Sequence, residues 1–237
     1  EESLTTGMRG MIQNNVYLED VLVGEENILG ISGKGMDVAQ DAMMYGRLAI
    51  AACSLGGIKR CLQLIHRYVT RRTISTGKHF DNAITLLKMN EISIMTTCLE
   101  KLVNKISLLI DNENFNSIEL FTIAKIIAPE FFWKASDHLV QILGGRGYID
   151  TNMVPQLMRD ARVLRIFEGP TETLSMYLGS RVLNKNEEME YLLVNKFKAP
   201  NIYDKLSEAI EIVITLKNNS FSETQNNQLN YLLISEF

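Results

Sequence analysis

The sequence predicts an all-α protein, an up-and-down bundle of helices preceded by a short β-rich remnant. Apolar residues recur at intervals of three and four from residue 36 to about residue 183, which is the period of an amphipathic helix. The first 30 residues instead carry two short β-rich stretches closed by Gly24. The helical pattern thus covers most of the chain, and the first 30 residues have a different pattern that is typical of strands.

Composition supports a folded chain and excludes several classes of function. The chain has 237 residues, of which 46% are hydrophobic, enough to bury a core and too many for a disordered protein. A formal net charge of −4 gives no electrostatic footprint for nucleic acid. The longest apolar run, residues 42–58, contains Arg47 and three glycines, so we expect it to fall short of a membrane span.

Residues 1–30 read as the end of a β domain. Residues 16–18 and 21–23 are rich in β-forming side chains and are separated by two acidic residues. One or two strands are not stable alone, so they need a sheet that this sequence does not contain. We therefore expect residues 1–30 to be a fragment of a β domain.

The helical bundle is predicted to occupy residues 31–184. Its first helix, residues 36–70, is apolar nearly all round in its middle, as in the centre of a bundle. A second helix is expected over residues 80–110, and shorter ones over 156–165 and 170–183.

A third long helix should begin after Ser117, which can cap it, and end before Gly144 and Gly145, a usual C-terminal signal. Pro129 lies within this helix and should kink it or open a turn. The same glycines with Gly147 form Gly-Gly-x-Gly, which follows a helix rather than a strand and is therefore not a dinucleotide-binding motif.

Residues 185–237 are predicted to be a helical extension. Polar breaks are expected at residues 218–219 and 226–227. An amphipathic stripe predicts docking on the bundle or on a partner chain; a membrane-surface helix is the alternative, which the polar face does not favour because it lacks excess Lys and Arg. The stripe comprises Ile202, Tyr203, Leu206, Ala209, Ile210 and Val213.

The cysteines and histidines suggest no metal site. Cys53, Cys61 and Cys98 lie in apolar helical stretches, and we interpret them as reduced, buried thiols of an intracellular or organellar protein. The three histidines have no metal-binding spacing, so no metal is predicted.

Two charged residues stand out as candidates for a site. Glu168 follows two apolar residues and precedes Gly169 and Pro170, so its carboxylate can be poorly hydrated at a turn, which suits proton abstraction beside a carbonyl group. The alternative is an acid at the N-terminus of the next helix, favoured by the helix dipole. Arg47 is the single charged residue between Asp41 and Lys59, so it should pair with a carboxylate or ligand oxygen, or else reach the surface.

Taken together, three segments resemble the signature of the acyl-CoA dehydrogenase family. They are residues 141–148 (QILGGRGY), 159–162 (RDAR) and 165–169 (RIFEG), in the family's order and spacing. Residues 23–36 are similar to the family's junction between its β domain and its C-terminal bundle, and residues 117–145 are closest to the very-long-chain branch. The resemblance covers residues 1–183.

The resemblance implies roles for individual residues. Glu168 matches the base that removes the α-proton of a fatty acyl-CoA while the β-hydride passes to FAD, giving a trans-2-enoyl-CoA. Some family members carry this base at the position of Gly46, which has no side chain. The remaining implied positions are Gly46, Arg47 and Gly169 for substrate, and Arg72, Gln141, Gly144, Gly145, Pro170, Thr171 and Glu172 for FAD, partly across a dimer interface.

The resemblance also implies partners: a fatty acyl-CoA substrate, an electron-transfer flavoprotein and assembly into a homodimer or tetramer. The expected location is mitochondrial in a eukaryote and cytoplasmic in a bacterium. Three positions depart from the family pattern: Ser75–Thr76 replace Phe-Gly, Pro155–Gln156 replace a charged pair, and Pro170 replaces threonine. These departures leave open a degenerate, non-catalytic bundle that serves as an assembly module.

Overall fold

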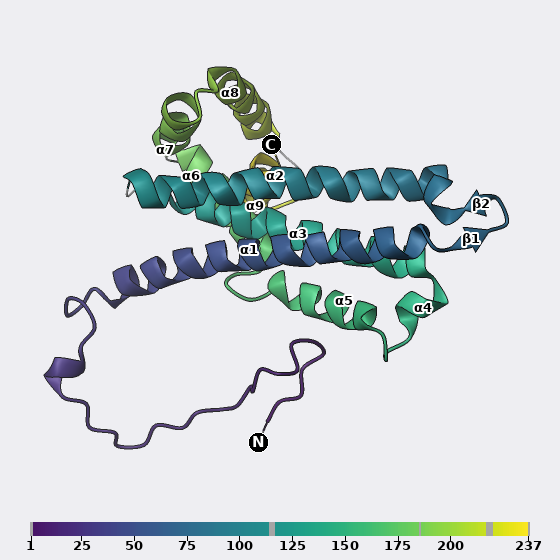
Figure 1. The fold of residues 1–237 in the computed structure, drawn as a ribbon. Helices are drawn as coiled ribbons and strands as arrows, with labels where there is room; N and C mark the ends of the chain where they lie inside the picture. The colour runs from purple at the N-terminus through teal and green to yellow at the C-terminus, as the bar shows by residue number, and fades with distance from the viewer. Residues whose placement is uncertain (1, 114–116, 185, 217–219, 237) are drawn as a thin grey trace. The chain divides into compact units, whose positions relative to one another are not determined.

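A computed structural model describes residues 2–113, 117–184, 186–216 and 220–236 (Figure 1). The described residues are mostly helical, which confirms the predicted fold class. The chain forms two compact units, Glu1–Glu168 and Gly169–Phe237.

The first unit is built on three long helices. Helix α3 packs against α1, α2 and α5, so it is the central helix of this unit. Its elements are η1 (Glu25–Asn27), α1 (Gly35–Val69), β1 (Thr73–Ile74), β2 (Gly77–Lys78), η2 (His79–Asp81), α2 (Ala83–Glu113), α3 (Ile118–Leu143), α4 (Gly145–Tyr148) and α5 (Met153–Leu164).

The core of this unit consists of large apolar side chains from the three long helices. Each such side chain stabilises the fold by about 1.5–3 kcal/mol when fully buried. Gly57 on α1 allows a close approach to α3, because a Cβ atom there would lie 2.4 Å from the ring of Phe132. The fully buried apolar side chains include Ile58, Ile65, Val69, Ile92, Leu99, Ile106, Leu109, Phe121 and Leu139.

Both predicted ends of α3 are confirmed. The Ser117 hydroxyl accepts a hydrogen bond from the Leu120 N–H at 3.3 Å, and Gly144 ends the helix with φ +58°. The helix continues through Pro129, so the alternative that this proline opens a turn is wrong. Proline in a helix interior costs about 3 kcal/mol, and the burial of Ala128, Pro129 and Phe132 against neighbouring helices offsets that cost.

The N-terminal segment contains no strand over residues 16–23, so the strands expected there are wrong. Val16, Tyr17 and Leu22 are largely exposed, as expected for β-forming residues without a partner strand. The β-structure of the described residues is instead a hairpin, in which β1 pairs antiparallel with β2 and Ile74 lies opposite Gly77. The turn of this hairpin is made by Ser75 and Thr76.

Helix α1 is, among the described residues, the one helix long and apolar enough to cross a membrane. The expectation that its apolar run falls short of a membrane span is therefore wrong. Length and composition alone are weak evidence, because a core helix of a bundle has the same pattern. Ile50, Ile58 and Ile65 are buried, and α1 contacts α3, α2 and α5, as a core helix does.

The three cysteines are free, but just one of them is buried. Cys61 has no exposed surface, and burial raises the pKa of its thiol to about 12. Cys53 and Cys98 are exposed, so the prediction of three buried thiols is wrong for these two. An apolar stretch of helix still has a solvent side, and these two residues lie on it.

The second unit is a smaller helical assembly. Helix α9 packs against α6, and α8 packs against α9 and the π-helix. Its elements are α6 (Thr171–Asn184), α7 (Asn186–Glu190), the π-helix Tyr191–Lys196, α8 (Pro200–Thr215) and α9 (Glu223–Ser235). Gly179 brings α6 onto α9, because a Cβ atom there would lie 1.9 Å from the carbonyl oxygen of Tyr231.

The tail partly follows its predicted pattern. Ala209 and Val213 of the amphipathic stripe are buried on α8. The break expected at residues 226–227 is wrong, because α9 runs through it. A capping box of Ser222 and Gln225 starts this helix, and the buried Asn226 amide donates to the carbonyl oxygens of Phe221 and Ser222. The break expected at residues 218–219 lies outside the described residues.

Candidate functional site

The segment after α5 places Glu168 by a sharp reversal of the backbone. The N–H groups of Ile166 and Phe167 donate to the carbonyl oxygen of Val163 and close the end of α5. Glu168 then has φ +55° and Gly169 φ +100°. A non-glycine residue in the left-handed region costs about 1–3 kcal/mol and concentrates at functional sites. Glu168 is therefore held in a conformation that its own side chain does not favour.

The Glu168 carboxylate lies against the first third of α1. A Cβ atom at Gly46 would be 3.1 Å from Oε1 of Glu168 and 3.4 Å from Oε2. Glycine at this position therefore leaves the room that the carboxylate occupies. Oε2 is buried and has no hydrogen-bond partner among the described residues, so it is a poorly hydrated acceptor. Such an atom costs free energy unless a ligand or a proton satisfies it.

Arg47, the residue after Gly46, does not pair with this carboxylate. Its Nη1 donates to the hydroxyl of Thr122 on α3 at 3.3 Å, and no carboxylate forms an ion pair with it among the described residues. Its Nε is also buried and has no hydrogen-bond partner among the described residues. The sequence predicted a charged partner or ligand oxygen for Arg47, and the neutral acceptor Thr122, 75 residues away, carried no signal in the sequence.

The positions after Glu168 belong to the second unit. Gly169 suits its place for two reasons, its positive φ and the lack of room for a side chain, since a Cβ atom would lie 2.9 Å from Leu174. Thr171 begins α6, and Glu172 is exposed in its first turn. Pro170 precedes the helix, a place where its missing N–H is not needed.

The remaining predicted cofactor residues lie at the far end of the first unit. Figure 1 shows the β-hairpin and α4 at the end where α1 and α3 finish. Arg72 precedes the hairpin, Gln141 and Gly144 lie at the end of α3, and Gly145 begins α4. From Arg47 to the end of α1 at Val69 is 22 residues, about 33 Å at 1.5 Å per residue. Within one chain these residues and Glu168 therefore do not form a single site.

The residues at this far end of the first unit are open to another molecule. Arg72 is exposed and has no ion-pair partner among the described residues. A Cβ atom at Gly144 or Gly145 would meet nothing within 4 Å, so the backbone there is open, and the positive φ of Gly144 is what requires glycine at that position. An unpaired arginine and an open glycine backbone are each features that a phosphate-bearing ligand can use. Ser75 and Thr76, which replace Phe-Gly, are exposed at the tip of the adjacent hairpin.

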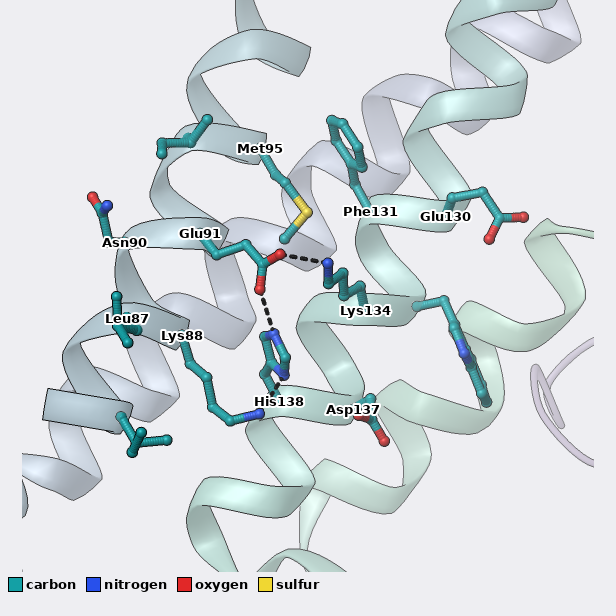
Figure 2. A pocket seen from close by; sticks show the side chains of 13 residues that line it. Leu87, Lys88, Asn90, Glu91, Met95, Glu130, Phe131, Lys134, Asp137 and His138 are labelled. Carbon is teal, nitrogen blue, oxygen red and sulfur yellow. Dashed lines mark hydrogen bonds and ion pairs between the residues drawn. The ribbon is translucent and has the colours of Figure 1, made fainter. Parts of the chain in front are cut away.

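A separate open groove of about 970 Å³ lies between α2 and α3 (Figure 2). At its floor, Lys88 lies 3.0 Å from Nδ1 of His138, and Nε2 of His138 lies 2.8 Å from Glu91. Lysine can donate but not accept, so Nδ1 accepts and Nε2–H donates to the carboxylate. Glu91 also pairs with Lys134. Hydrogen bonds from Lys134 and then His138 hold the pKa of Glu91 below its usual value. This chain of contacts satisfies its own polar groups, so we assign it no chemistry.

Across the described residues, no three His, Cys, Asp or Glu side chains are placed to hold a metal ion. The candidate site consists of the Glu168 carboxylate, Gly46 against which it lies, and Arg47, the next residue of α1. Such an arrangement can take a proton from a carbon acid whose carbonyl oxygen is held by N–H donors.

Comparison with known proteins identifies the family. Residues 33–183 match the model of the acyl-CoA dehydrogenase C-terminal domain, which is more than half of the chain. The chain belongs to the acyl-CoA dehydrogenase family. The predicted resemblance is thereby confirmed, and α1 to α6 form the family's C-terminal helical domain.

Individual relatives agree with this assignment. The chain is 29% identical over 185 residues to the very long-chain specific acyl-CoA dehydrogenase of mouse mitochondria, covering 77% of this chain and 28% of that protein. It is 32% identical over 182 residues to the caffeyl-CoA reductase-Etf complex subunit CarC of Acetobacterium woodii, covering 76% of this chain and 47% of that subunit. The chain thus spans less than half the length of these two relatives.

A solved structure shows the same fold. An acyl-CoA dehydrogenase from Bacillus anthracis, solved in complex with FAD, matches with a TM-score of 0.72 and 22% identity. The match covers 92% of this chain and 39% of that one. It therefore extends beyond the residues of the family domain into the tail.

Proposed function

We propose that this chain is the C-terminal part of an FAD-dependent enzyme that oxidises a fatty acyl-CoA to a trans-2-enoyl-CoA, with Glu168 as the catalytic base. One observation carries the proposal. The carboxylate of Glu168 is held in a left-handed backbone conformation against Gly46, and its Oε2 is buried without a partner. A base that must take a proton from carbon needs an acceptor atom that nothing else occupies.

The chemistry follows from the acidity of the carbon beside a thioester carbonyl. Glu168 takes the α-proton, and the electron pair left on carbon moves toward the carbonyl oxygen. The backbone N–H of Glu168 is the donor proposed to hold that oxygen, where a preorganised donor stabilises the developing charge. Bound FAD would supply the acceptor for the hydride from the β-carbon.

Arg72, Gln141, Gly144 and Gly145 are proposed to hold the adenosine and diphosphate end of FAD. Because about 33 Å of α1 separates the end of that helix from Arg47, these residues serve the flavin of a neighbouring subunit in this proposal. A homodimer or tetramer is therefore part of it. Pro170, Thr171 and Glu172 are proposed to approach the flavin of the chain's own subunit.

The preferred substrate class is a long or very long acyl chain, since a very long-chain specific enzyme is among the relatives. An electron-transfer flavoprotein is the proposed electron acceptor, in line with the Etf complex to which the Acetobacterium woodii relative belongs. The proposed location is mitochondrial in a eukaryote and cytoplasmic in a bacterium.

The test uses the full-length protein with the substitution Glu168→Gln, which keeps the shape and removes the base. We expect acyl-CoA oxidation to fall by at least about 10²-fold, the usual contribution of a positioned base. The yellow colour of bound flavin should remain, because the FAD-contacting residues are unchanged. Activity near the wild-type level in a yellow preparation would exclude Glu168 as the base.

A non-catalytic assembly module is the alternative. The observation that favours it is the hairpin tip, where Ser75 and Thr76 stand in place of Phe-Gly beside Arg72. A full-length preparation that is colourless and still forms complexes would support this alternative. A yellow preparation that oxidises acyl-CoA would exclude it.

A further inference from the structure

Arg165 lies three residues before Glu168 and ties that part of the chain to α3. Its Nε donates to Oε1 of Glu130 at 2.7 Å, and its guanidinium carbon lies 5.9 Å from the ring centroid of Trp133. Glu130 and Trp133 are three positions apart on α3, so their side chains share one face of that helix. A planar guanidinium that meets a carboxylate and an aromatic ring together is held in one orientation, because it must satisfy both.

The ion pair between Arg165 and Glu130 is partly shielded from water. The two side chains are 24% and 32% exposed, whereas those of the Lys59–Glu100 pair are 48% and 45% exposed. Solvent and salt screen an exposed pair, so the less exposed pair fixes its side chains more firmly. The Lys59–Glu100 pair joins α1 to α2 and is therefore a suitable comparison, with the same chemistry between two other helices.

The turn that carries Glu168 needs support from the structure around it. Glu168 has φ +55° and Gly169 φ +100°, and a non-glycine residue stays in the left-handed region when its surroundings fix it there. Oε2 of Glu168 has no hydrogen-bond partner among the described residues, so this atom does not hold the turn. The side chain of Ile166 is exposed and does not anchor it either. Arg165 supplies a fixed point on α3 immediately before the turn.

This fixed point is near enough to determine where the carboxylate lies. Three residues of chain span about 10–11 Å at most, so a displacement of Arg165 is passed on to Glu168. At the other end of the segment, a Cβ atom at Gly46 would lie 3.1 Å from Oε1 of Glu168, so the carboxylate occupies a limited space on α1. A misplacement of about 1 Å can lower the rate of a reaction about 10²-fold. The position of this segment therefore matters for any chemistry at the carboxylate.

We propose that Arg165 is a positioning residue, which binds Glu130 and Trp133 on α3 and thereby fixes the segment that follows it. The fixed segment holds the Glu168 carboxylate in its place beside Gly46. The consequence for catalysis rests on the proposed function of Glu168. The fixing of the segment does not, since it concerns contacts within this chain alone.

The first experiment measures the fixing of the segment without using activity. Amide hydrogen exchange of the peptide covering residues 163–169 is followed by mass spectrometry in the full-length protein, because the N–H groups of Ile166 and Phe167 are hydrogen-bonded in the folded chain. The variants are Arg165→Met, which keeps a long side chain and removes its charge, Glu130→Ala, and the two combined. The control is Glu100→Ala, which breaks the Lys59–Glu100 pair in the same way.

We expect amide exchange of this peptide to be about tenfold faster in Arg165→Met, because the released segment opens more often. Glu130→Ala should also accelerate it, but should add little in the Arg165→Met background, where the pair is already broken. Glu100→Ala should leave the rate unchanged. Wild-type exchange in Arg165→Met, or full additivity of the Arg165→Met and Glu130→Ala effects, would overturn the proposal. If Arg165→Met does not fold, equal rates in Glu130→Ala and Glu100→Ala would overturn it.

The second experiment uses the full-length protein and acyl-CoA oxidation. Arg165→Met should lower kcat about tenfold with little change in KM or in bound flavin. In the Glu168→Gln background it should lower the residual rate little, because Arg165 acts through that carboxylate. An equal loss in both backgrounds, or an unchanged kcat in Arg165→Met when amide exchange shows a released segment, would overturn the positioning role. If instead Glu168→Gln itself keeps full activity, the proposed base is wrong, while amide exchange still decides whether Arg165 fixes the segment.

Discussion

Two neighbouring glycines on α1 form a matched pair of substitutions with opposite expected effects on stability. A Cβ atom at Gly57 would lie 2.4, 2.5 and 2.7 Å from three ring atoms of Phe132, and one at Gly56 would meet nothing within 4 Å. Phe132 is buried on α3, so its ring cannot move aside without disturbing a packed core. The close approach of α1 to α3 therefore depends on Gly57 and not on Gly56.

The magnitudes follow from two opposing terms. Alanine is favoured over glycine in a helix by about 1 kcal/mol, so Gly56→Ala should raise the free energy of unfolding by about that amount. Gly57→Ala gains the same term but overpacks the core, which costs about 1–3 kcal/mol. The net effect of Gly57→Ala lies between zero and about 2 kcal/mol of destabilisation. The difference between the two variants isolates the steric term.

The assay is urea unfolding followed by the fluorescence of Trp133, the single tryptophan of the chain, which is next to Phe132 on α3. Gly57→Ala should unfold at a lower urea concentration than Gly56→Ala, with a similar slope. If Gly57→Ala is as stable as Gly56→Ala, α1 and α3 are not in the contact that the structure describes.

Two further predictions concern titration and reactivity. Glu91 has a lowered pKa in the folded chain, so its contacts contribute stability above the unfolded pKa and lose it as the pH falls through the lowered one. Glu91→Gln should therefore cost less than about 1 kcal/mol at pH 7, as for exposed ion pairs, and progressively less as the pH falls through the lowered pKa; a cost that persists unchanged in acid would contradict this. Cys61, with its buried thiol and a pKa of about 12, should resist a maleimide at pH 8 in the Cys53→Ser/Cys98→Ser variant until the chain is unfolded. Rapid labelling of that folded variant would contradict the buried position.

Much of the helical architecture was predictable from local signals. Ser117 and Gly144 bracket α3 with a cap at each end, and both act through atoms within four residues of the helix terminus. The period of apolar residues similarly located α1 and α2. These features depend on neighbouring residues, so a sequence contains them directly.

Features that depend on distant residues were not predictable in this way. The hairpin of β1 and β2 has two residues in each strand, too short for an alternating pattern. The burial of Asn226 and the capping box before it override a polar composition that predicts a break. Residues 16–23 have β-forming side chains but no partner strand, so local preference alone did not produce a strand.

The residues of the candidate site also divide into those that local sequence signals predicted and those that depend on distant contacts. The motif around Glu168 predicted a carboxylate at a turn, and the structure places that carboxylate against Gly46. Thr122 was not identified, because its contact with Arg47 joins residues 75 positions apart. A hydroxyl on an apolar helix has no distinguishing sequence pattern, and its hydrogen bond with Arg47 is visible once α1 and α3 are packed together.

The central claim is that Glu168 exchanges a proton with the α-carbon of an acyl-CoA. The most direct measurement is incorporation of deuterium at that carbon when the full-length protein is incubated with a fatty acyl-CoA in D₂O without an electron acceptor. Glu100→Gln, which changes an exposed carboxylate paired with Lys59 on the surface, serves as the control. We predict exchange in the wild type and in Glu100→Gln, and its loss in a flavin-bound Glu168→Gln. Exchange at the wild-type rate in Glu168→Gln would contradict the account.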